Sequence, residues 1–129
     1  MKNFFGEIIN TYFETTKTGK LTATYGSGQV RTDNITVPAG LYVLTSTIQG
    51  DTSAGKSLTT GIFHTRIHST TEELASGSHN GNSGYGMTYN IAKIVKFDED
   101  TTIYALGQTS SSENVGGGMK VILRAAKIS

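Results

Sequence analysis

Apolar and polar residues alternate along most of the chain, which is the pattern of β-strands that bury one face. The clearest case is residues 35–49, ITVPAGLYVLTSTIQ, where β-branched and aromatic residues alternate after a proline and a glycine. Proline fixes φ and lacks an N–H, so it stands at strand starts and turns rather than inside a central strand. Pro38 and Gly40 therefore predict a turn that leads into a core strand.

Shorter alternating runs follow, separated by polar and glycine-rich segments. We expect strands at residues 58–69, 87–97, 102–108 and 119–128, and two short strands around a Gly-Ser-Gly turn within residues 19–32. Within residues 58–69 one face would carry Phe63, Thr65 and Ile67, and the other Ile62, His64, Arg66 and His68. Strands that recur about every 10–15 residues with turn residues between them predict an antiparallel β-sandwich or barrel.

The first sixteen residues have a different period. Large apolar residues recur there at three- and four-residue spacing, which predicts a short helix; they are Phe4, Phe5, Ile8, Ile9, Tyr12 and Phe13. A helix of this length is marginal alone and needs a partner surface. It either packs against its own domain or anchors the domain to a larger assembly. We therefore divide the chain into an anchor segment, residues 1–18, and a head domain, residues 19–129.

Composition agrees with a single all-β domain and excludes several classes of function. Among 129 residues there are 32 Thr or Ser and 16 Gly, which favour strands and turns over helices. The net charge of +1 gives no nucleic-acid footprint, and no apolar run reaches the ~20 residues of a membrane helix. Cysteine is absent, so disulfides and thiolate chemistry are excluded. The N-terminal residues lack the apolar stretch of a secretory signal.

Residues 50–57, GDTSAGKS, match the phosphate-loop pattern GxxxxGK[ST]. In a phosphate loop a helix begins at the Lys-Ser step and aims its backbone N–H groups at the phosphates. The residues that follow, LTTGIFHTRIHS, have the period of a strand. We interpret the segment as a loop between strands and keep nucleotide binding as a remote alternative.

Other candidate chemistry is sparse. His64 and His68 would share a metal only on a helix, because on a strand they stand ~13 Å apart. The acidic run Asp98-Glu99-Asp100 could hold calcium, but a solvated hairpin turn explains it better. No nucleophile, general base or carboxylate pair falls on common geometry. We predict a non-enzymatic protein with no metal and no cofactor.

The order of the elements resembles the C1q/TNF-like superfamily. The step VPAGLYVLTSTI is similar to its proline–glycine–tyrosine strand, and a strand with an acidic turn, a serine/glycine loop and the closing strand MKVILRAAKI follow in order. The resemblance covers roughly residues 20–129. It implies a ten-strand jelly roll that forms a homotrimer, with the closing strand beside the first one in the inner sheet. Heads of this kind also cap fibres and appendages of bacterial viruses, a branch that the small size and lack of cysteine favour.

We therefore predict a bacteriophage structural protein of the virion, the trimeric knob of a head fibre or tail fibre, with a role in host-surface attachment. The alternative is a free-standing C1q-like module that binds a glycan or a protein. The anchor segment would join a capsid or tail protein. The glycine-, serine- and asparagine-rich stretch of residues 76–86, SGSHNGNSGYG, predicts a loop. Contact with a host-surface glycan is expected in and beside this loop, at Ser78, His79, Asn80, Asn82, Tyr85 and Tyr89. Trimer contact is expected at Tyr104, Leu106, Val121 and Leu123, with either Tyr42/Leu44 or Val43/Thr45.

Overall fold

The computed structural model describes residues 11–81 and 87–129, and these ranges contain nine strands. The strands are β1 (Tyr12–Lys20), β2 (Val30–Arg31), β3 (Ile35–Val37), β4 (Gly40–Gly50), β5 (Gly61–Ser69), β6 (Glu73–Gly81), β7 (Thr88–Phe97), β8 (Thr101–Thr109) and β9 (Gly118–Lys127). Two 3₁₀ turns, Gly26–Gly28 and Ser112–Asn114, are the only helical elements in the described ranges. None of them is long and apolar enough to cross a membrane.

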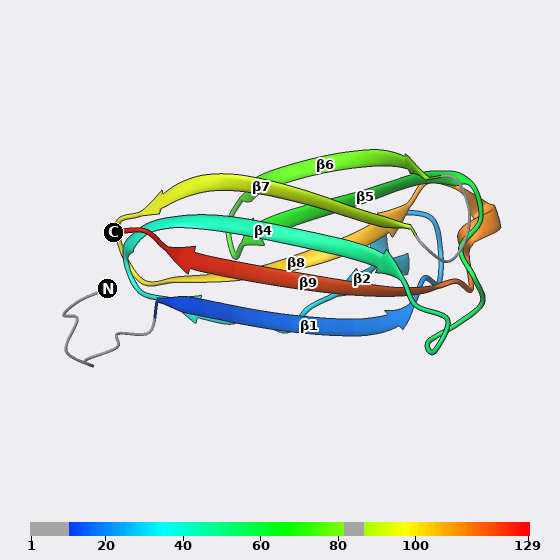
Figure 1. Cartoon of the computed structure of the whole chain (residues 1–129), viewed down its shortest axis with the longest axis horizontal. Coiled ribbons are helices and arrows are strands. Elements are labelled where there is room, and N and C mark those ends of the chain that lie inside the picture. Colours follow the sequence, from blue (N-terminus) through cyan, green and yellow to red (C-terminus); the bar gives the residue numbers. More distant parts are fainter. Residues whose placement is uncertain (1–10, 82–86) are drawn as a thin grey trace.

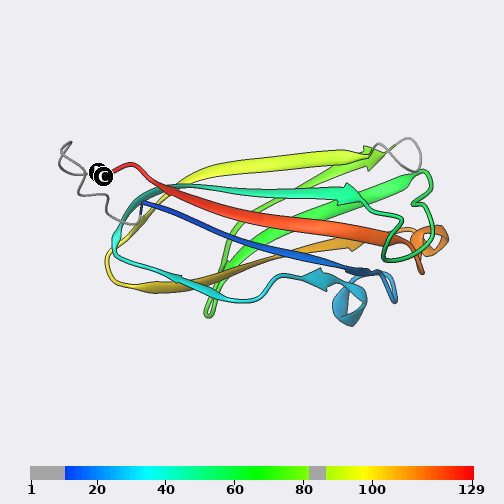
Figure 2. The ribbon, with the colours of Figure 1, turned by 60° about the horizontal axis from the view of Figure 1, so that its bottom comes forward.

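Two antiparallel sheets pack face to face (Figures 1 and 2). One has the order β1-β9-β4-β7, and the other has the order β2-β8-β5-β6 with β3 also paired to β8. The pairs β1·β9, β3·β8, β4·β7 and β5·β6 are nested, as if one long hairpin were rolled up. This is the jelly-roll arrangement of a β-sandwich. The predicted all-β jelly roll is confirmed, with β9 beside β1 as expected.

The segment of residues 35–49 is two strands in two sheets. β3 belongs to the sheet of β8, and β4 belongs to the sheet of β9, so Pro38 and Ala39 carry the chain across. The Tyr42 hydroxyl donates to the Pro38 carbonyl at 2.7 Å and holds this corner. Gly40 has a φ of +154°, and a Cβ there would stand 2.9 Å from the Ser129 oxygen. β4 therefore begins at this glycine, as predicted.

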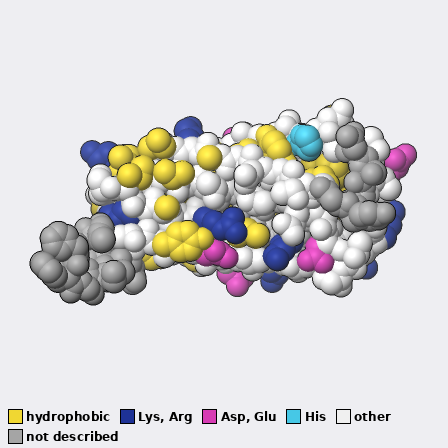
Figure 3. Space-filling view, in the orientation of Figure 1, with side chains coloured by type: hydrophobic (Ala, Val, Ile, Leu, Met, Phe, Trp, Pro, Cys, Tyr) yellow, Lys and Arg dark blue, Asp and Glu magenta, His cyan; other side chains and the backbone are white. Residues whose placement is uncertain are grey.

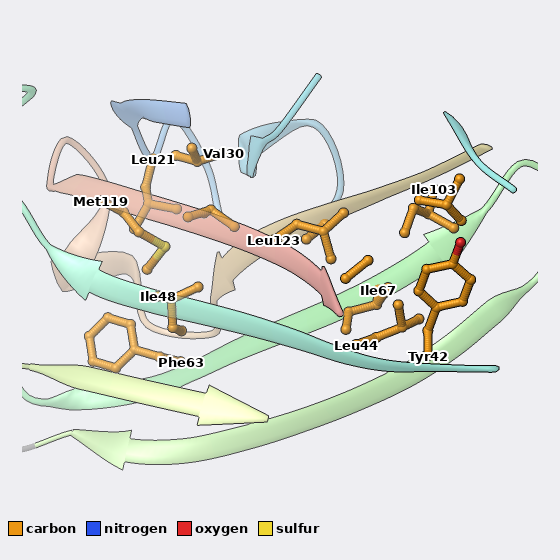
Figure 4. Close-up of a cluster of buried hydrophobic side chains, with 14 of the residues drawn as sticks. Leu21, Val30, Tyr42, Leu44, Ile48, Phe63, Ile67, Ile103, Met119 and Leu123 are labelled. Carbon is orange, nitrogen blue, oxygen red and sulfur yellow. The ribbon is translucent and has the colours of Figure 1, made fainter. Parts of the chain in front are cut away.

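The core lies between the sheets and is lined by alternate residues of nearly every strand (Figure 4). Ten of its buried side chains are Leu21, Val30, Tyr42, Leu44, Ile48, Phe63, Ile67, Ile103, Met119 and Leu123. Phe63, Thr65 and Ile67 of β5 point inward and His64, Arg66 and His68 do not, as the alternation predicted. The faces of this strand were therefore readable from the sequence.

The helix predicted for residues 1–16 is wrong in its described part. Tyr12 and Phe13 lie in β1, which pairs along its whole length with β9. Phe13 packs toward the Tyr42 ring at 6.4 Å, while Tyr12 is on the outer face. The expected break between residues 18 and 19 falls inside this strand, which completes the sheet. Phe4, Phe5, Ile8 and Ile9 lie outside the described residues.

The loop predicted for residues 76–86 is also wrong over residues 76–81, which belong to β6. Small residues suit this strand because side chains of the facing sheet and of the neighbouring strand β5 lie directly against it. A Cβ on Gly77 would stand 2.6 Å from the Tyr89 hydroxyl, and one on Gly81 would stand 2.7 Å from the Phe63 ring. The glycines that suggested a loop are therefore packing positions in a strand.

Candidate interaction surfaces

The outer face of the four-stranded sheet carries an apolar patch at the end where β1 begins and β9 finishes. Register places Tyr12, Ala126, Val43 and Ile94 side by side across all four strands. Leu41 and Ile128, joined by a backbone hydrogen bond of 2.7 Å, extend this row. Tyr12, Ile94 and Ile128 are 53%, 63% and 51% exposed. Figure 3 views this face, with apolar side chains gathered at that end. We call these six residues the apolar patch.

The rest of this face is polar and rich in threonine. Two successive rows across the strands read Thr16, Ile122, Thr47, Asn90 and Thr18, Lys120, Gln49, Thr88. Next to the apolar patch, Arg124 forms an ion pair with Glu14, with Nε 3.4 Å from Oε1. The Tyr12 hydroxyl donates to Glu14 at 2.7 Å, and this bond lowers the pKa of Glu14 and raises the pKa of Tyr12. The face is therefore an ordered, mostly uncharged platform.

Two of the four residues predicted for trimer contact cannot make it. Val121 and Leu123 are 0% exposed and point into the core, so no second chain can contact their side chains. Tyr104 and Leu106 alternate with the core residues Ile103 and Ala105, which places them on the outer face of the other sheet, where Leu106 is itself only 5% exposed. On β4 the outward residues are Val43 and Thr45, not Tyr42 and Leu44. In the closing strand the charged residues Lys120 and Arg124 alternate with Val121 and Leu123, so the sequence itself indicates that Val121 and Leu123 face inward.

The residues predicted for receptor contact do not form one loop surface. Ser78 and Asn80 lie on β6, and Tyr89 lies on β7. The His79 and Tyr89 rings stack on one another, 5.1 Å apart and within 11° of parallel, where the edges of the two sheets meet. That contact covers one face of the Tyr89 ring. Asn82 and Tyr85 lie outside the described residues.

The loop of residues 50–57 does not have the geometry of a phosphate loop. No helix follows it, and β5 begins at Gly61. Its backbone is already bonded to the loop before β9, through Lys56 N–H to the Gly116 carbonyl and Gly118 N–H to the Lys56 carbonyl, both 3.0 Å. Hydrogen bonds from Ser53 to the Asp51 carboxylate lower the pKa of Asp51. The segment is therefore a loop between β4 and β5, as interpreted, and it lacks the helix that the remote phosphate-loop alternative requires.

The outer face of the five-stranded sheet carries a set of aromatic and charged residues, of which the sequence indicated His64, His68 and Tyr104 but not Tyr25 or Arg31. The Arg31 guanidinium carbon lies 3.6 Å above the centre of the Tyr104 ring, and His68 stacks on that ring with centroids 5.4 Å apart. Farther along the face, the Tyr25 hydroxyl is 2.8 Å from Nε2 of His64. Burial, and then the charge of Arg66, lower the pKa of His64. Arg31 and Tyr25 come from an irregular segment without periodicity, so no sequence signal singled them out.

His64 and His68 thus have separate partners on this face. Across residues 11–81 and 87–129, no three His, Asp or Glu side chains are grouped so as to hold a metal ion.

No protein-family model and no curated protein sequence matches the chain. Solved structures similar to it include rabbit GITRL, with 13% identity over 83% of this chain and 91% of that one, at a TM-score of 0.35. The likeness is one of fold. The enzymatically active domain of bacteriophage CBA120 tailspike protein 4 has 14% identity over 95% of this chain and 20% of that one, at 0.39. The VP2 subviral particle of infectious bursal disease virus has 9% identity over 100% of this chain and 42% of that one, at a TM-score of 0.35.

Proposed function

We propose that the chain is a non-enzymatic viral structural module, the homotrimeric knob of a bacteriophage head fibre or tail fibre. The observation that carries this is the apolar patch. Three of its side chains are more than half exposed and lie together on one regular sheet face. Covering apolar surface stabilises an assembly by about 25 cal/mol per Å². Contiguous exposed apolar surface of this kind marks an interaction site.

The size and polarity of the face support contact between copies of the chain. A stable interface buries roughly 800 Å² per partner, which needs about 20–30 residues. The six residues of the apolar patch are too few, so the neighbouring threonine-rich rows must also be covered. Their hydroxyl and amide groups can form hydrogen bonds across an interface, which leaves few buried polar groups unpaired. An interface between copies with an apolar end and a polar remainder fits both halves of the face.

The position of the chain ends supports an anchored knob. β1 begins and β9 ends beside the apolar patch, because Tyr12 pairs with Ala126. The described chain therefore starts at that end, and we propose that the preceding residues, which include Phe4, Phe5, Ile8 and Ile9, join a capsid or tail protein. The opposite end carries the loops of residues 51–60 and 110–117 (Figure 1). Loops on a rigid sandwich are free to vary and suit attachment to a host surface.

Light scattering after size-exclusion chromatography tests the assembly. The wild-type chain of 13.7 kDa should elute at three times that mass, about 41 kDa. Ile94→Lys places a charge in the apolar patch and should give a monomer. Ile62→Lys is the matched control, because Ile62 is also exposed (42%) but lies on the other sheet. A monomeric wild type, or equal dissociation by both variants, would overturn the proposal.

The viral role has its own test. Genes for capsid or tail proteins next to the coding sequence would support it, and a setting of unrelated metabolic genes would argue for the free-standing binding module instead. This outcome is separate from the mass measurement, since a trimer can serve either role.

A further inference from the structure

Arg31 is held in a fixed orientation on the outer face of the five-stranded sheet. Its guanidinium carbon lies 3.6 Å from the centre of the Tyr104 ring, and that ring stacks with His68 within 8° of parallel. One Nη2 hydrogen is fixed by a bond of 2.9 Å to Oδ1 of Asn34. A guanidinium that is stacked and bonded in this way loses little further conformational entropy when it binds a second group.

Arg31 has no ion-pair partner in the described part of the chain. Arg66 forms an ion pair with Glu73 at 2.8 Å, and Arg124 forms one with Glu14. Among the described residues no carboxylate lies within ion-pair distance of Arg31. The Asn34 bond uses one of the five N–H donors of Arg31. These donors form a planar fork that matches two carboxylate oxygens.

An open depression of about 310 Å³ lies beside this guanidinium, lined by Arg31, Thr32, Asp33 and Asn34. Its lining is mostly polar and includes the Asp33 carboxylate and the Asn34 amide. Such groups exchange hydrogen bonds with hydroxyl groups.

We propose that this depression binds an acidic saccharide, with the sugar carboxylate on the Arg31 fork and ring hydroxyls on Asn34 and Asp33. Arg31 supplies charge and geometry, Tyr104 and His68 act as positioning residues that hold it, and Asn34 bonds both the arginine and the sugar. The site lies on the sheet opposite the apolar patch, so it does not depend on trimer formation. A sugar acid with its carboxylate esterified, or a neutral sugar, would lose the main contact.

The test is an NMR titration of the ¹⁵N-labelled full chain with methyl glucuronide, methyl glucoside and N-acetylglycine. Methyl glucuronide should shift the Arg31 Nε–H signal and the amides of residues 31–34, with a dissociation constant on the order of 1 mM, because exposed charge pairs are weak. Methyl glucoside should cause no shift. N-acetylglycine, which carries the carboxylate of a peptide end, should bind about fivefold more weakly, because it lacks the ring hydroxyls.

Two variants make the outcome specific. Arg31→Lys keeps the charge and loses the fork, so it should weaken glucuronide binding about fivefold or more. Arg124→Lys, the same change on the opposite sheet, should leave it unaltered. Equal affinity for glucuronide and glucoside, unchanged binding by Arg31→Lys, or the absence of shifts at about 50 mM glucuronide would overturn the proposal. Tighter binding of N-acetylglycine would assign the site to a peptide carboxylate and overturn the saccharide. Light scattering on the same samples reports separately whether the trimer is present.

Discussion

One buried hydrogen-bond chain joins the two sheets through the centre of the core, and it makes a quantitative prediction. Ser46 of β4 and Thr65 of β5 are both 0% exposed, and their hydroxyl oxygens are 2.6 Å apart. The Thr65 hydroxyl donates to the Leu106 carbonyl at 2.9 Å. The Ser46 hydroxyl must therefore be the donor to Thr65. Both hydroxyls of this hydrogen-bond chain have a partner, and this permits two polar groups in the core.

Single and double substitutions should not add. Thr65→Val keeps the shape of the side chain but leaves the Ser46 hydroxyl buried without a partner, which should lower the free energy of unfolding by about 2 kcal/mol. Ser46→Ala removes one hydrogen bond and leaves Thr65 bonded to Leu106, so it should cost about 1 kcal/mol. The double variant leaves no unpaired hydroxyl. Its cost should be about 1.5 kcal/mol, roughly half the sum of the two.

Urea unfolding, followed by circular dichroism at one fixed protomer concentration, measures all four proteins of this cycle. The concentration is fixed because assembly contributes to the apparent stability of an oligomer. A double-variant effect that equals the sum of the two single effects to within about 0.3 kcal/mol would contradict this coupling. A larger loss of unfolding free energy for Ser46→Ala than for Thr65→Val would also contradict it.

Three further predictions concern packing, the sheet edges and pH. Gly118→Ala should cost about 2 kcal/mol or more and lower Tm by roughly 8 °C, because its Cβ would overlap the Asp51 carbonyl oxygen; Gly19→Ala, which meets only the Val30 methyls at 3.6 Å, should change Tm little. Lys17 and Lys93 occupy inward positions on the two edge strands of the four-stranded sheet, so replacing both by Val should increase aggregation on heating, measured by light scattering, and no increase would contradict this. Because burial and then Arg66 hold the pKa of His64 below its usual value, the unfolded chain binds that proton more readily, and stability should fall as pH drops below about 6.5. His64→Gln should reduce this fall in urea unfolding at different pH values, and an unchanged pH dependence would count against the assignment.

The order of strands and turns could be predicted from the sequence because apolar residues alternate with polar ones along most strands, and turn residues separate the strands. The acidic turn after Phe97 and the start of β4 at Gly40 are examples that depend only on local chemistry. Tyr12 and Phe13 were assigned to a helix because their apolar neighbours have helical spacing. Their strand conformation comes from pairing with β9, more than a hundred residues away, which no local pattern contains.

The surfaces were less predictable than the fold. On β9 the inward direction of Val121 and Leu123 could have been predicted from Lys120 and Arg124, which alternate with them. The apolar patch joins residues from four strands that are distant in sequence. The stack of Arg31 on Tyr104 similarly depends on β2 pairing with β8. Such groupings arise from register, which a single sequence does not show.

The reactivity of a single introduced cysteine tests directly whether other copies of the chain cover the apolar patch, since the chain has no cysteine of its own. Ile94→Cys places a thiol in the apolar patch and Ile62→Cys places one on the other sheet, at positions 63% and 42% exposed in one chain. At a concentration that favours assembly, the account predicts that the thiol at position 94 reacts with a maleimide about tenfold or more slowly than the thiol at position 62, and recovers on dilution. Equal or faster reaction at position 94 at every concentration would contradict it.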